Sequence, residues 1–255
     1  MRALVADIGN THVRIVAWTD ADRLPRLGAD GWVAAPALAT VARLATPVSP
    51  GEDDAFVVAL REAVAGAGGA PLVAVSVVPR VAALVAGAVP QVRWADHAAR
   101  LPFTHRLADA AATGADRLCN IAAAVGAGLG DALVVDAGTA TTVDILAGGV
   151  YLGGVIAPGM AFALEAISRR AARLPQVPFG EVPLAAAPDT VTALAAGAFH
   201  AGVGGVEALV AGLQRRHGPC PVVVTGGLGS VLARPGWFHD PHWTFRGAAC
   251  LCLPD

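Results

Sequence analysis

The sequence contains no lysine, and all 18 of its basic residues are arginine. This absence excludes a phosphate-binding loop of the form GxxxxGK[ST], because the lysine of that loop contacts the nucleotide phosphates. It also excludes catalysis through a lysine Schiff base. If the chain binds a nucleotide, arginines, backbone N–H groups and metal ions must neutralise the phosphate charge.

Charge and cysteine are also scarce. The formal net charge is only −2, which gives no electrostatic support for a nucleic-acid partner. The four cysteines (Cys119, Cys220, Cys250 and Cys252) show neither a CxxC pair nor zinc-ligand spacing. We interpret them as small buried hydrophobic residues in a reducing compartment. Because Cys250 and Cys252 lie two apart in an apolar tail, they are expected on one face of a strand.

Targeting and membrane segments are not evident. Arg2 leads directly into a strand-like run, so we expect a cytoplasmic protein. The most membrane-like stretch is 191–213, which is rich in alanine and glycine but contains His200 and Glu207. This pattern favours a buried or subunit-interface helix over a membrane span.

One phrase occurs twice in the 255 residues. Residues 3–15 read ALVADIGNTHVRI and residues 132–145 read ALVVDAGTATTVDI. Each is an apolar run, an Asp-x-Gly turn and a second strand-like run, and the two copies lie about half a chain apart. The repeat predicts a duplicated α/β fold with two domains, 1–112 and 113–255.

The hydrophobic patterns alternate between strands and helices, which predicts sheets covered by helices. Strands are predicted near 2–7, 12–18, 71–78, 92–94, 132–136, 140–146, 150–157 and 221–225. Helices are predicted over 52–65, 81–88, 159–173 and 190–217, and 108–130 is expected to be mostly helical with a break at Thr113-Gly114. Residues 19–51 show no clear pattern. The proline-rich segment 174–188 reads as a connection.

The two Asp-x-Gly turns are candidate phosphate sites. Glycine allows the backbone to approach phosphate oxygens, and an adjacent carboxylate can hold a metal ion. The first turn offers Asp7, Gly9, Asn10 and Thr11 with Arg14 beyond, and the second offers Asp136, Gly138 and Thr139. Alternatively, the first turn is a plain hairpin whose Asp and Asn serve turn chemistry. We interpret Thr141 and Thr142 as ordinary strand residues.

Two further motifs leave their alternatives open. Thr113-Gly114-Ala115-Asp116-Arg117 is either a structural ion pair or a catalytic base beside an anion anchor. Val222–Gly227 is a buried strand that ends in Thr-Gly-Gly, which leaves room for a flat ring against the backbone. We interpret it as the adenosine side of a nucleotide site, and the alternative is an ordinary strand-to-helix turn.

Together these motifs resemble the type III pantothenate kinases over nearly the whole chain. The matching segments are DIGNT at 7–11, SVVP at 76–79, GADR at 114–117, DAGTATT at 136–142, GGVIAPG at 153–159, Thr190 with Gly197, and TGG at 225–227. The resemblance implies the superfamily of acetate and sugar kinases, heat-shock ATPases and actin. Two ribonuclease-H-like domains would then hold ATP in the cleft between them.

The resemblance also implies an activity and roles for residues. A homodimer would transfer phosphate from ATP to pantothenate, which gives 4′-phosphopantothenate in the first step of coenzyme A biosynthesis. Asp116 would be the base, and Mg²⁺ and a monovalent cation (K⁺ or NH₄⁺) would be bound with the help of Asp7 and Asp136. The ATP site would contain Asp7, Gly9, Asn10, Thr11, Arg14, Gly138, Thr139, Gly226 and Gly227, and the pantothenate site Leu107, Gly114, Ala115, Asp116, Arg117 and, across the dimer interface, Thr190.

Two departures from the family pattern stand out. Leu107 replaces a frequent aromatic residue, and Arg14 replaces a frequent lysine. The alternative function is therefore a regulatory ATP-binding relative without kinase activity. The presence of all the acids that catalysis needs argues against this alternative.

Overall fold

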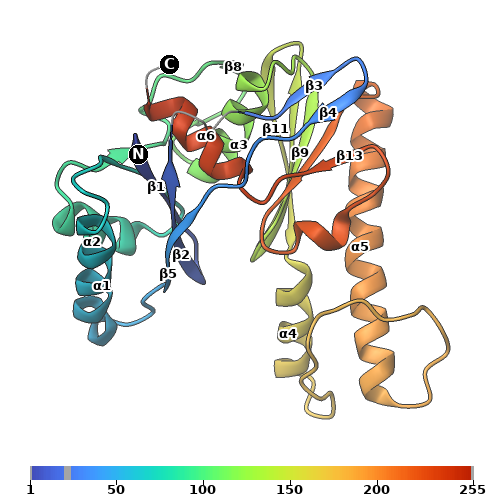
Figure 1. Cartoon of the computed structure of the whole chain (residues 1–255). Helices are drawn as coiled ribbons and strands as arrows, with labels where there is room; N and C mark the ends of the chain where they lie inside the picture. The colour runs from blue at the N-terminus through green and yellow to red at the C-terminus, as the bar shows by residue number, and fades with distance from the viewer. Residues whose placement is uncertain (1, 20–23, 254–255) are drawn as a thin grey trace. The chain divides into compact units, whose positions relative to one another are not determined.

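The computed structural model describes residues 2–19 and 24–253, which form two compact units (Figure 1). Unit 1 holds the described residues up to Gly130, together with Gly148–Leu152 and the residues from His242 on. Unit 2 holds Asp131–Ala147 and Gly153–Pro241.

The sheet of unit 1 has the order β5-β2-β1-β6-β7. Its strands are β1 (Ala3–Ile8), β2 (His12–Trp18), β5 (Thr40–Ala45), β6 (Leu72–Ser76) and β7 (Arg93–Trp94). β2 runs antiparallel to both β1 and β5, whereas β1, β6 and β7 are parallel. A separate hairpin joins β3 (Arg26–Gly28) and β4 (Gly31–Val33).

Helices cover both faces of this sheet, and β1 shows which side chains they bury. Leu4, Ala6 and Ile8 pack with α1 (Asp53–Ala65) and α2 (Pro79–Ala88), whereas Ala3 and Val5 pack with α3 (Ala115–Gly126) and α6 (Trp243–Cys252). Successive strand residues point to opposite faces. Asp7 therefore lies on the face that carries α3 and α6.

The sheet of unit 2 repeats the same topology. Five of its six strands lie in the order β13-β12-β9-β10-β11, with β9 (Ala132–Ala137), β10 (Ala140–Ala147), β11 (Val150–Pro158), β12 (Val222–Thr225) and β13 (Trp237–His239). In both units the five strands, numbered along the chain, lie in the order 3-2-1-4-5. This repeat confirms the prediction of two ribonuclease-H-like folds.

The remaining elements are short or peripheral to these sheets. The first residues of β11 pair in parallel with β8 (Thr104–His105). Unit 2 also contains α4 (Met160–Arg170), α5 (Thr190–His217) and the 3₁₀ turn η2 (Gly229–Leu232), and a second 3₁₀ turn, η1 (Pro50–Glu52), precedes α1. Residues 174–188 form neither helix nor strand, as the prolines predicted.

Three expectations were wrong. Residues 108–114 are irregular rather than helical, since α3 begins only at Ala115. Cys250 and Cys252 belong to a helix and not to a strand, because the apolar tail covers α3 instead of extending a sheet. Cys119 is buried, but Cys220, Cys250 and Cys252 are only half-buried; all four thiols are free.

The predicted domain bounds, 1–112 and 113–255, place α3 and α6 in the second domain, whereas both helices belong to unit 1. The Trp243 indole donates to the Asn120 carbonyl at 2.9 Å, and the Thr244 hydroxyl donates to the Asn120 side chain at 2.9 Å. Gly247 lies directly on the backbone of Cys119, where a Cβ atom would overlap the carbonyl. Both helices also pack against β1 and β6 of the first sheet, and so they belong to unit 1.

Candidate functional site

The first Asp-x-Gly turn forms a hairpin in unit 1. The Gly9 N–H donates to the His12 carbonyl at 3.1 Å, and Asp7 lies opposite Arg14 across the β1–β2 pair. Burial raises the pKa of Asp7 from 3.8 to about 6, Arg14 lowers it, and the charge of Asp116 raises it. The structure therefore brings the acids of two separate motifs close together on the face of β1 that carries α3.

Asp116 occupies the first turn of α3, where backbone N–H groups favour a negative charge. Its carboxylate accepts a hydrogen bond from the Arg117 N–H at 2.8 Å. A Cβ atom on Gly114 would lie 2.6 Å from Oδ1 of Asp116, which is too close for a non-bonded contact. Gly114 thus leaves space for the carboxylate to fold back over the start of the helix, and a carboxylate held in this way can act as a base.

The C-terminal helix supplies a contact that the sequence did not predict. The Arg14 guanidinium carbon lies 4.8 Å from the ring centroid of Phe245 in α6, in the range of a cation–π contact. This contact orients Arg14 beside Asp7. The only sequence signal for Phe245 is its place in an apolar tail, which indicates burial but not this role.

The second Asp-x-Gly turn forms a hairpin in unit 2. The Gly138 N–H donates to the Ala140 carbonyl at 3.0 Å, and Asp136 lies beside Thr225 of the parallel strand β12. Gly226 has φ +88°, and a Cβ atom there would lie 2.5 Å from Oδ1 of Asp136. Gly226 of the predicted adenosine motif therefore lies directly against Asp136, the predicted cation ligand. Only glycine fits at position 226.

A helix start adds to the second turn. The N–H of Gly159, which precedes α4, donates to the Thr139 carbonyl at 3.1 Å, and a Cβ atom on Gly159 would overlap the carbonyl oxygens of Gly138 and Thr139. The N-terminus of α4 thus lies against the Gly138-Thr139 turn, and helix N-termini favour anions. This contribution was not predicted from the sequence, although the glycine that ends GGVIAPG was a signal for it.

The predicted site residues fall into two groups, one in each unit. Unit 1 contains Asp7, Gly9, Asn10, Thr11, Arg14, Leu107, Gly114, Ala115, Asp116 and Arg117, and unit 2 contains Asp136, Gly138, Thr139, Thr190, Gly226 and Gly227. Leu107 is half-buried in the irregular segment after β8. Within the described residues no group of three or more His, Cys, Asp or Glu side chains could hold a metal ion. A single carboxylate in each turn, Asp7 or Asp136, still fits Mg²⁺, because this ion is commonly bound by only one or two carboxylates together with substrate phosphates.

Three threonines behave differently from the rest of the site. Thr190 is exposed at the first position of α5 and does not cap the helix; Asp189 does, by accepting the Thr192 N–H at 2.9 Å. This bond and a second one from the Thr192 hydroxyl lower the pKa of Asp189. Thr141 and Thr142 lie inside β10, as interpreted from the sequence, and their buried hydroxyls have no hydrogen-bond partner among the described residues.

A family model and two curated relatives point to the same family. A family model described as type III pantothenate kinase matches residues 3–212. The type III pantothenate kinase of Acidiphilium cryptum is 38% identical over 156 residues, which are 59% of this chain and 59% of the relative. That of Cereibacter sphaeroides is 42% identical over 135 residues, 52% of each. The chain thus spans little more than half the length of the curated relatives that it matches.

Solved structures resemble the chain in fold alone. A Campylobacter jejuni protein named for the Baf family of transcriptional activators aligns over 96% of this chain and 94% of its own, with a TM-score of 0.58 and 22% identity. The ethanolamine utilization protein EutJ from Carboxydothermus hydrogenoformans aligns over 98% and 89%, with a TM-score of 0.52 and 14% identity. Both similarities extend over almost the whole chain and therefore support its overall α/β fold. Because the family model covers most of the sequence, the chain belongs to the type III pantothenate kinase family.

Proposed function

We propose that this chain transfers the γ-phosphate of ATP to the primary hydroxyl of pantothenate and forms 4′-phosphopantothenate, in the first step of coenzyme A biosynthesis. The observation that carries the proposal is the position of Asp116 in the first turn of α3, near enough to Asp7 to raise its pKa. The Asp116 carboxylate accepts the proton of the attacking hydroxyl. Arg117 binds the carboxylate of pantothenate through a forked contact. Leu107, Gly114 and Ala115 complete its pocket.

The phosphate-binding role belongs to the two Asp-x-Gly hairpins. Gly9, Asn10, Thr11 and Arg14 contact phosphate oxygens beside Asp7, and Gly138 and Thr139 do so beside Asp136. Gly226 and Gly227 receive the adenosine. The open space at Gly227 supports this assignment, because a Cβ atom there would meet no atom of the described residues within 4 Å. Asp7 would hold Mg²⁺, and Asp136 would hold K⁺ or NH₄⁺. When bound, these cations neutralise phosphate charge that a lysine neutralises in other kinases.

Product analysis tests the proposal directly. Purified protein is incubated with ATP, Mg²⁺, K⁺ and pantothenate, and 4′-phosphopantothenate is measured by mass spectrometry. We expect product formation that depends on both substrates. ATP binding without product, across a range of cation conditions, would instead favour the regulatory alternative.

Asp136→Ala is expected to abolish stimulation by monovalent cations. Loss of a charged ligand lowers cation affinity or activity by about 10-fold or more. Activity is measured in KCl, NH₄Cl and NaCl at constant ionic strength. Asp131→Ala is the matched control, because Asp131 is exposed just before the opposite end of β9. Full activity of the wild type in NaCl alone would contradict the cation assignment.

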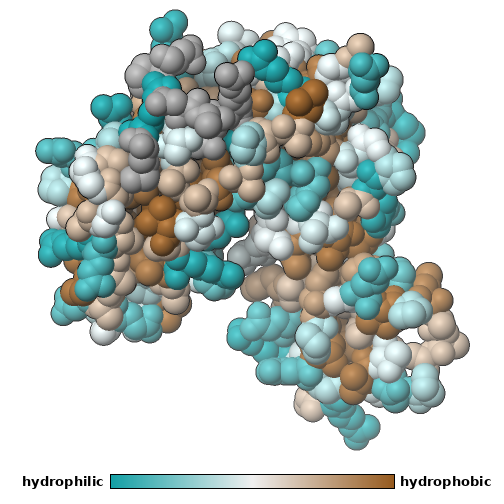
Figure 2. Space-filling model, in the orientation of Figure 1, coloured by the Kyte–Doolittle hydropathy of each residue, from teal (hydrophilic) through white to brown (hydrophobic). Residues whose placement is uncertain are grey.

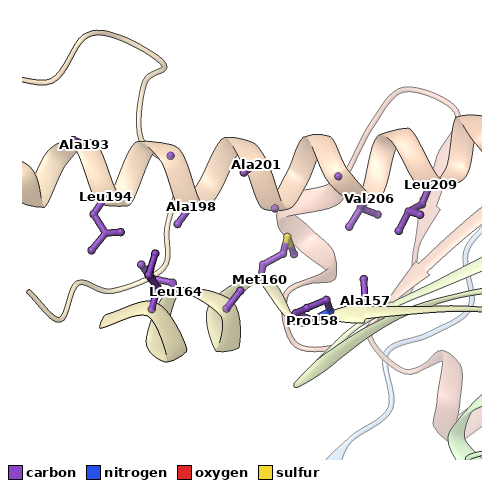
Figure 3. Close-up of a pocket in the computed structure, with 15 residues that line it drawn as sticks. Ala157, Pro158, Met160, Leu164, Ala193, Leu194, Ala198, Ala201, Val206 and Leu209 are labelled. Carbon is purple, nitrogen blue, oxygen red and sulfur yellow. The ribbon is translucent and has the colours of Figure 1, made fainter. Parts of the chain in front are cut away.

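The apolar surface of unit 2 supports a homodimer. A groove of about 740 Å³ runs between α4 and α5, and its lining is almost entirely apolar (Figure 3). Ile167 in its lining is about half exposed, as are Phe162 in α4 and Val191 in the first turn of α5. Brown apolar side chains lie among teal ones in the part of the surface that holds α4 and the first turns of α5 (Figure 2). A second copy that covers this face would remove the apolar surface from water. We extend the proposal to a cytoplasmic homodimer.

The groove bears on the membrane question as well. By length and composition α5 is apolar enough to cross a membrane, and 28% of its most apolar window is buried. Such a helix is weak evidence for a membrane span. The small side chains of α5 allow close helix packing. We therefore assign the exposed face to a second subunit and not to lipid.

Thr190→Val is expected to weaken pantothenate binding more than ATP binding, because we place Thr190 beside the partner's pantothenate site. Loss of one hydrogen bond corresponds to a rise of about 2- to 10-fold in KM for pantothenate. Asp189 caps α5, so the helix start should survive the substitution. Steady-state kinetics and light scattering are measured together. Equal losses for both substrates, or a fully active monomer, would contradict the shared site.

A further inference from the structure

The segment of residues 46–52, which joins β5 to α1, contacts the first Asp-x-Gly turn. Thr46 is buried, with 6% of its surface exposed. Its hydroxyl donates to the Gly9 carbonyl at 2.7 Å, and its N–H donates to the Thr11 carbonyl at 3.1 Å. One residue outside the motif thus fixes two of the three peptide groups in the turn.

The bond to Gly9 determines where the next N–H group points. A trans peptide is planar, and its C=O and N–H bonds point in opposite directions. Among the described residues there are no cis peptide bonds. Because the Gly9 carbonyl points to Thr46, the Asn10 N–H points away from Thr46. The proposed function places Asn10 in contact with phosphate oxygens, and this N–H is a donor that can make the contact.

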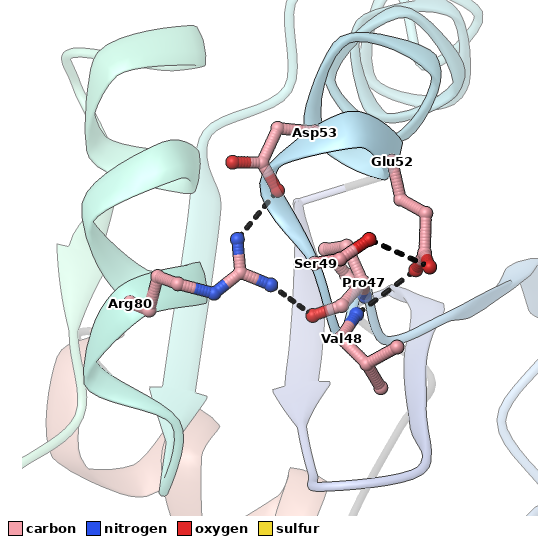
Figure 4. Close-up of polar contacts among 6 residues, drawn as sticks. All are labelled: Pro47, Val48, Ser49, Glu52, Asp53 and Arg80. Carbon is pink, nitrogen blue, oxygen red and sulfur yellow. Dashed lines mark hydrogen bonds and ion pairs between the residues drawn. The ribbon is translucent and has the colours of Figure 1, made fainter.

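An arginine from the SVVP motif region holds this segment in place. Arg80, in the first turn of α2, binds the Pro47 carbonyl through one nitrogen and the Asp53 carboxylate at 2.5 Å through another (Figure 4). The Glu52 side chain accepts the Val48 N–H at 2.9 Å and the Ser49 hydroxyl at 3.0 Å. The backbone next to Thr46 is therefore tied to both α1 and α2.

The SVVP motif itself orients α2. The Val77 N–H donates to the Ile8 carbonyl at 3.2 Å, and the Ser76 hydroxyl accepts the Val78 N–H at 3.1 Å. Pro79 then starts α2 with a φ value that suits a first helical position. These contacts place Arg80 at the side of the turn where Thr46 lies, and they give a role to a motif that the proposed chemistry does not use.

We propose that Thr46 is a positioning residue for nucleotide binding and that Arg80 supports it. Thr46 orients the Gly9–Asn10 peptide so that its N–H can meet a phosphate oxygen, and Arg80 fixes the segment that carries Thr46. The inference rests on the proposed function for its link to ATP. Its claim about the turn stands on the contacts alone.

The test uses Thr46→Val, which keeps the side-chain shape and removes the hydroxyl. We expect KM for ATP to rise about 3- to 10-fold, which corresponds to one hydrogen bond, while kcat and KM for pantothenate stay within about twofold. Hydrogen exchange of the Gly9–Thr11 amides should become faster. Thr46→Ser restores the hydroxyl and should restore both properties. Thr40→Val, at the exposed far end of β5, is the matched control and should change neither.

Arg80→Ala should make hydrogen exchange of the same amides faster and should raise KM for ATP. Its control is Arg169→Ala, which removes an exposed ion pair with Glu165 in α4. If Thr46→Val leaves both the hydrogen exchange of the Gly9–Thr11 amides and the direct binding of ATP unchanged, the positioning role is wrong. It is also wrong if both KM values rise together and Thr46→Ser rescues neither. If the wild type makes no phosphopantothenate, the proposed function fails, but the exchange measurement still decides whether Thr46 and Arg80 position the turn.

Discussion

The Asp116→Asn variant is expected to lose about 10²- to 10⁴-fold in kcat, which is the usual effect of removing a general base. An amide has the same size as the carboxylate, and its oxygen can still accept the Arg117 N–H that Asp116 binds at 2.8 Å. The start of α3 should therefore survive, and KM for ATP should change little. Steady-state kinetics with both substrates varied, together with thermal unfolding, check this expectation.

Asp109→Asn is the matched control for this substitution. The Asp109 carboxylate also accepts a backbone N–H, that of Ala111 at 2.8 Å, but it is exposed and lies outside the proposed site. The control should keep full activity. An equally active Asp116→Asn enzyme would reduce Asp116 to a helix-start residue. Because the charge of Asp116 raises the pKa of Asp7, the same variant should also lower the pKa of Asp7 from about 6.

Asp7→Asn is expected to lower kcat/KM by about 10²-fold or more, since it removes the negative charge that we propose holds Mg²⁺ beside the phosphates. It should also stabilise the protein without ligands at neutral pH. The folded-state pKa of Asp7 is raised from 3.8 to about 6. The Asp7 carboxyl group therefore makes its full contribution to the free energy of unfolding below pH 3.8, and this contribution is lost as pH rises through 6. The asparagine stays neutral throughout.

Thermal unfolding at two pH values separates the two effects of this variant. At pH 7.5 the ligand-free Asp7→Asn protein should exceed the wild type by up to about 3 kcal/mol, because one pKa unit corresponds to about 1.4 kcal/mol. At pH 4 the difference should largely disappear, since Asp7 is then mostly protonated in the folded wild type. An equal difference at both pH values would show that the ionisation of Asp7 does not govern its effect on stability.

Strong hydrophobic patterns predicted the elements that build the sheets. The pattern for 190–217 coincides with α5, and the repeat at Asp7 and Asp136 corresponds to two hairpins of the same topology. The strand β5 was missed because it is an edge strand with mostly exposed side chains, so it has no buried run that would reveal it. β3 and β4 are too short for a pattern to appear.

Single motifs of the site were also readable from the sequence, but their neighbours were not. The sequence alone shows that each turn has a glycine two residues after an aspartate. The contacts of Gly226 with Asp136 and of Phe245 with Arg14 join residues far apart in the chain, and no local pattern encodes them. Threonine is a common N-cap residue, but Thr190 is already the first residue of α5. Asp189, one residue earlier, caps the helix instead.

The position of α6 has a consequence for synthesis on the ribosome. Unit 1 begins with the first strands of the chain, yet Phe245 and Ala248 of α6 complete its core beside β1 and α3. All residues of unit 2 leave the ribosome before this helix does. One apolar face of the sheet in the nascent N-terminal half therefore stays uncovered by α6 until the end of translation. By that time all residues of unit 2 have already been synthesised. The half that is translated first is the half that finishes folding last.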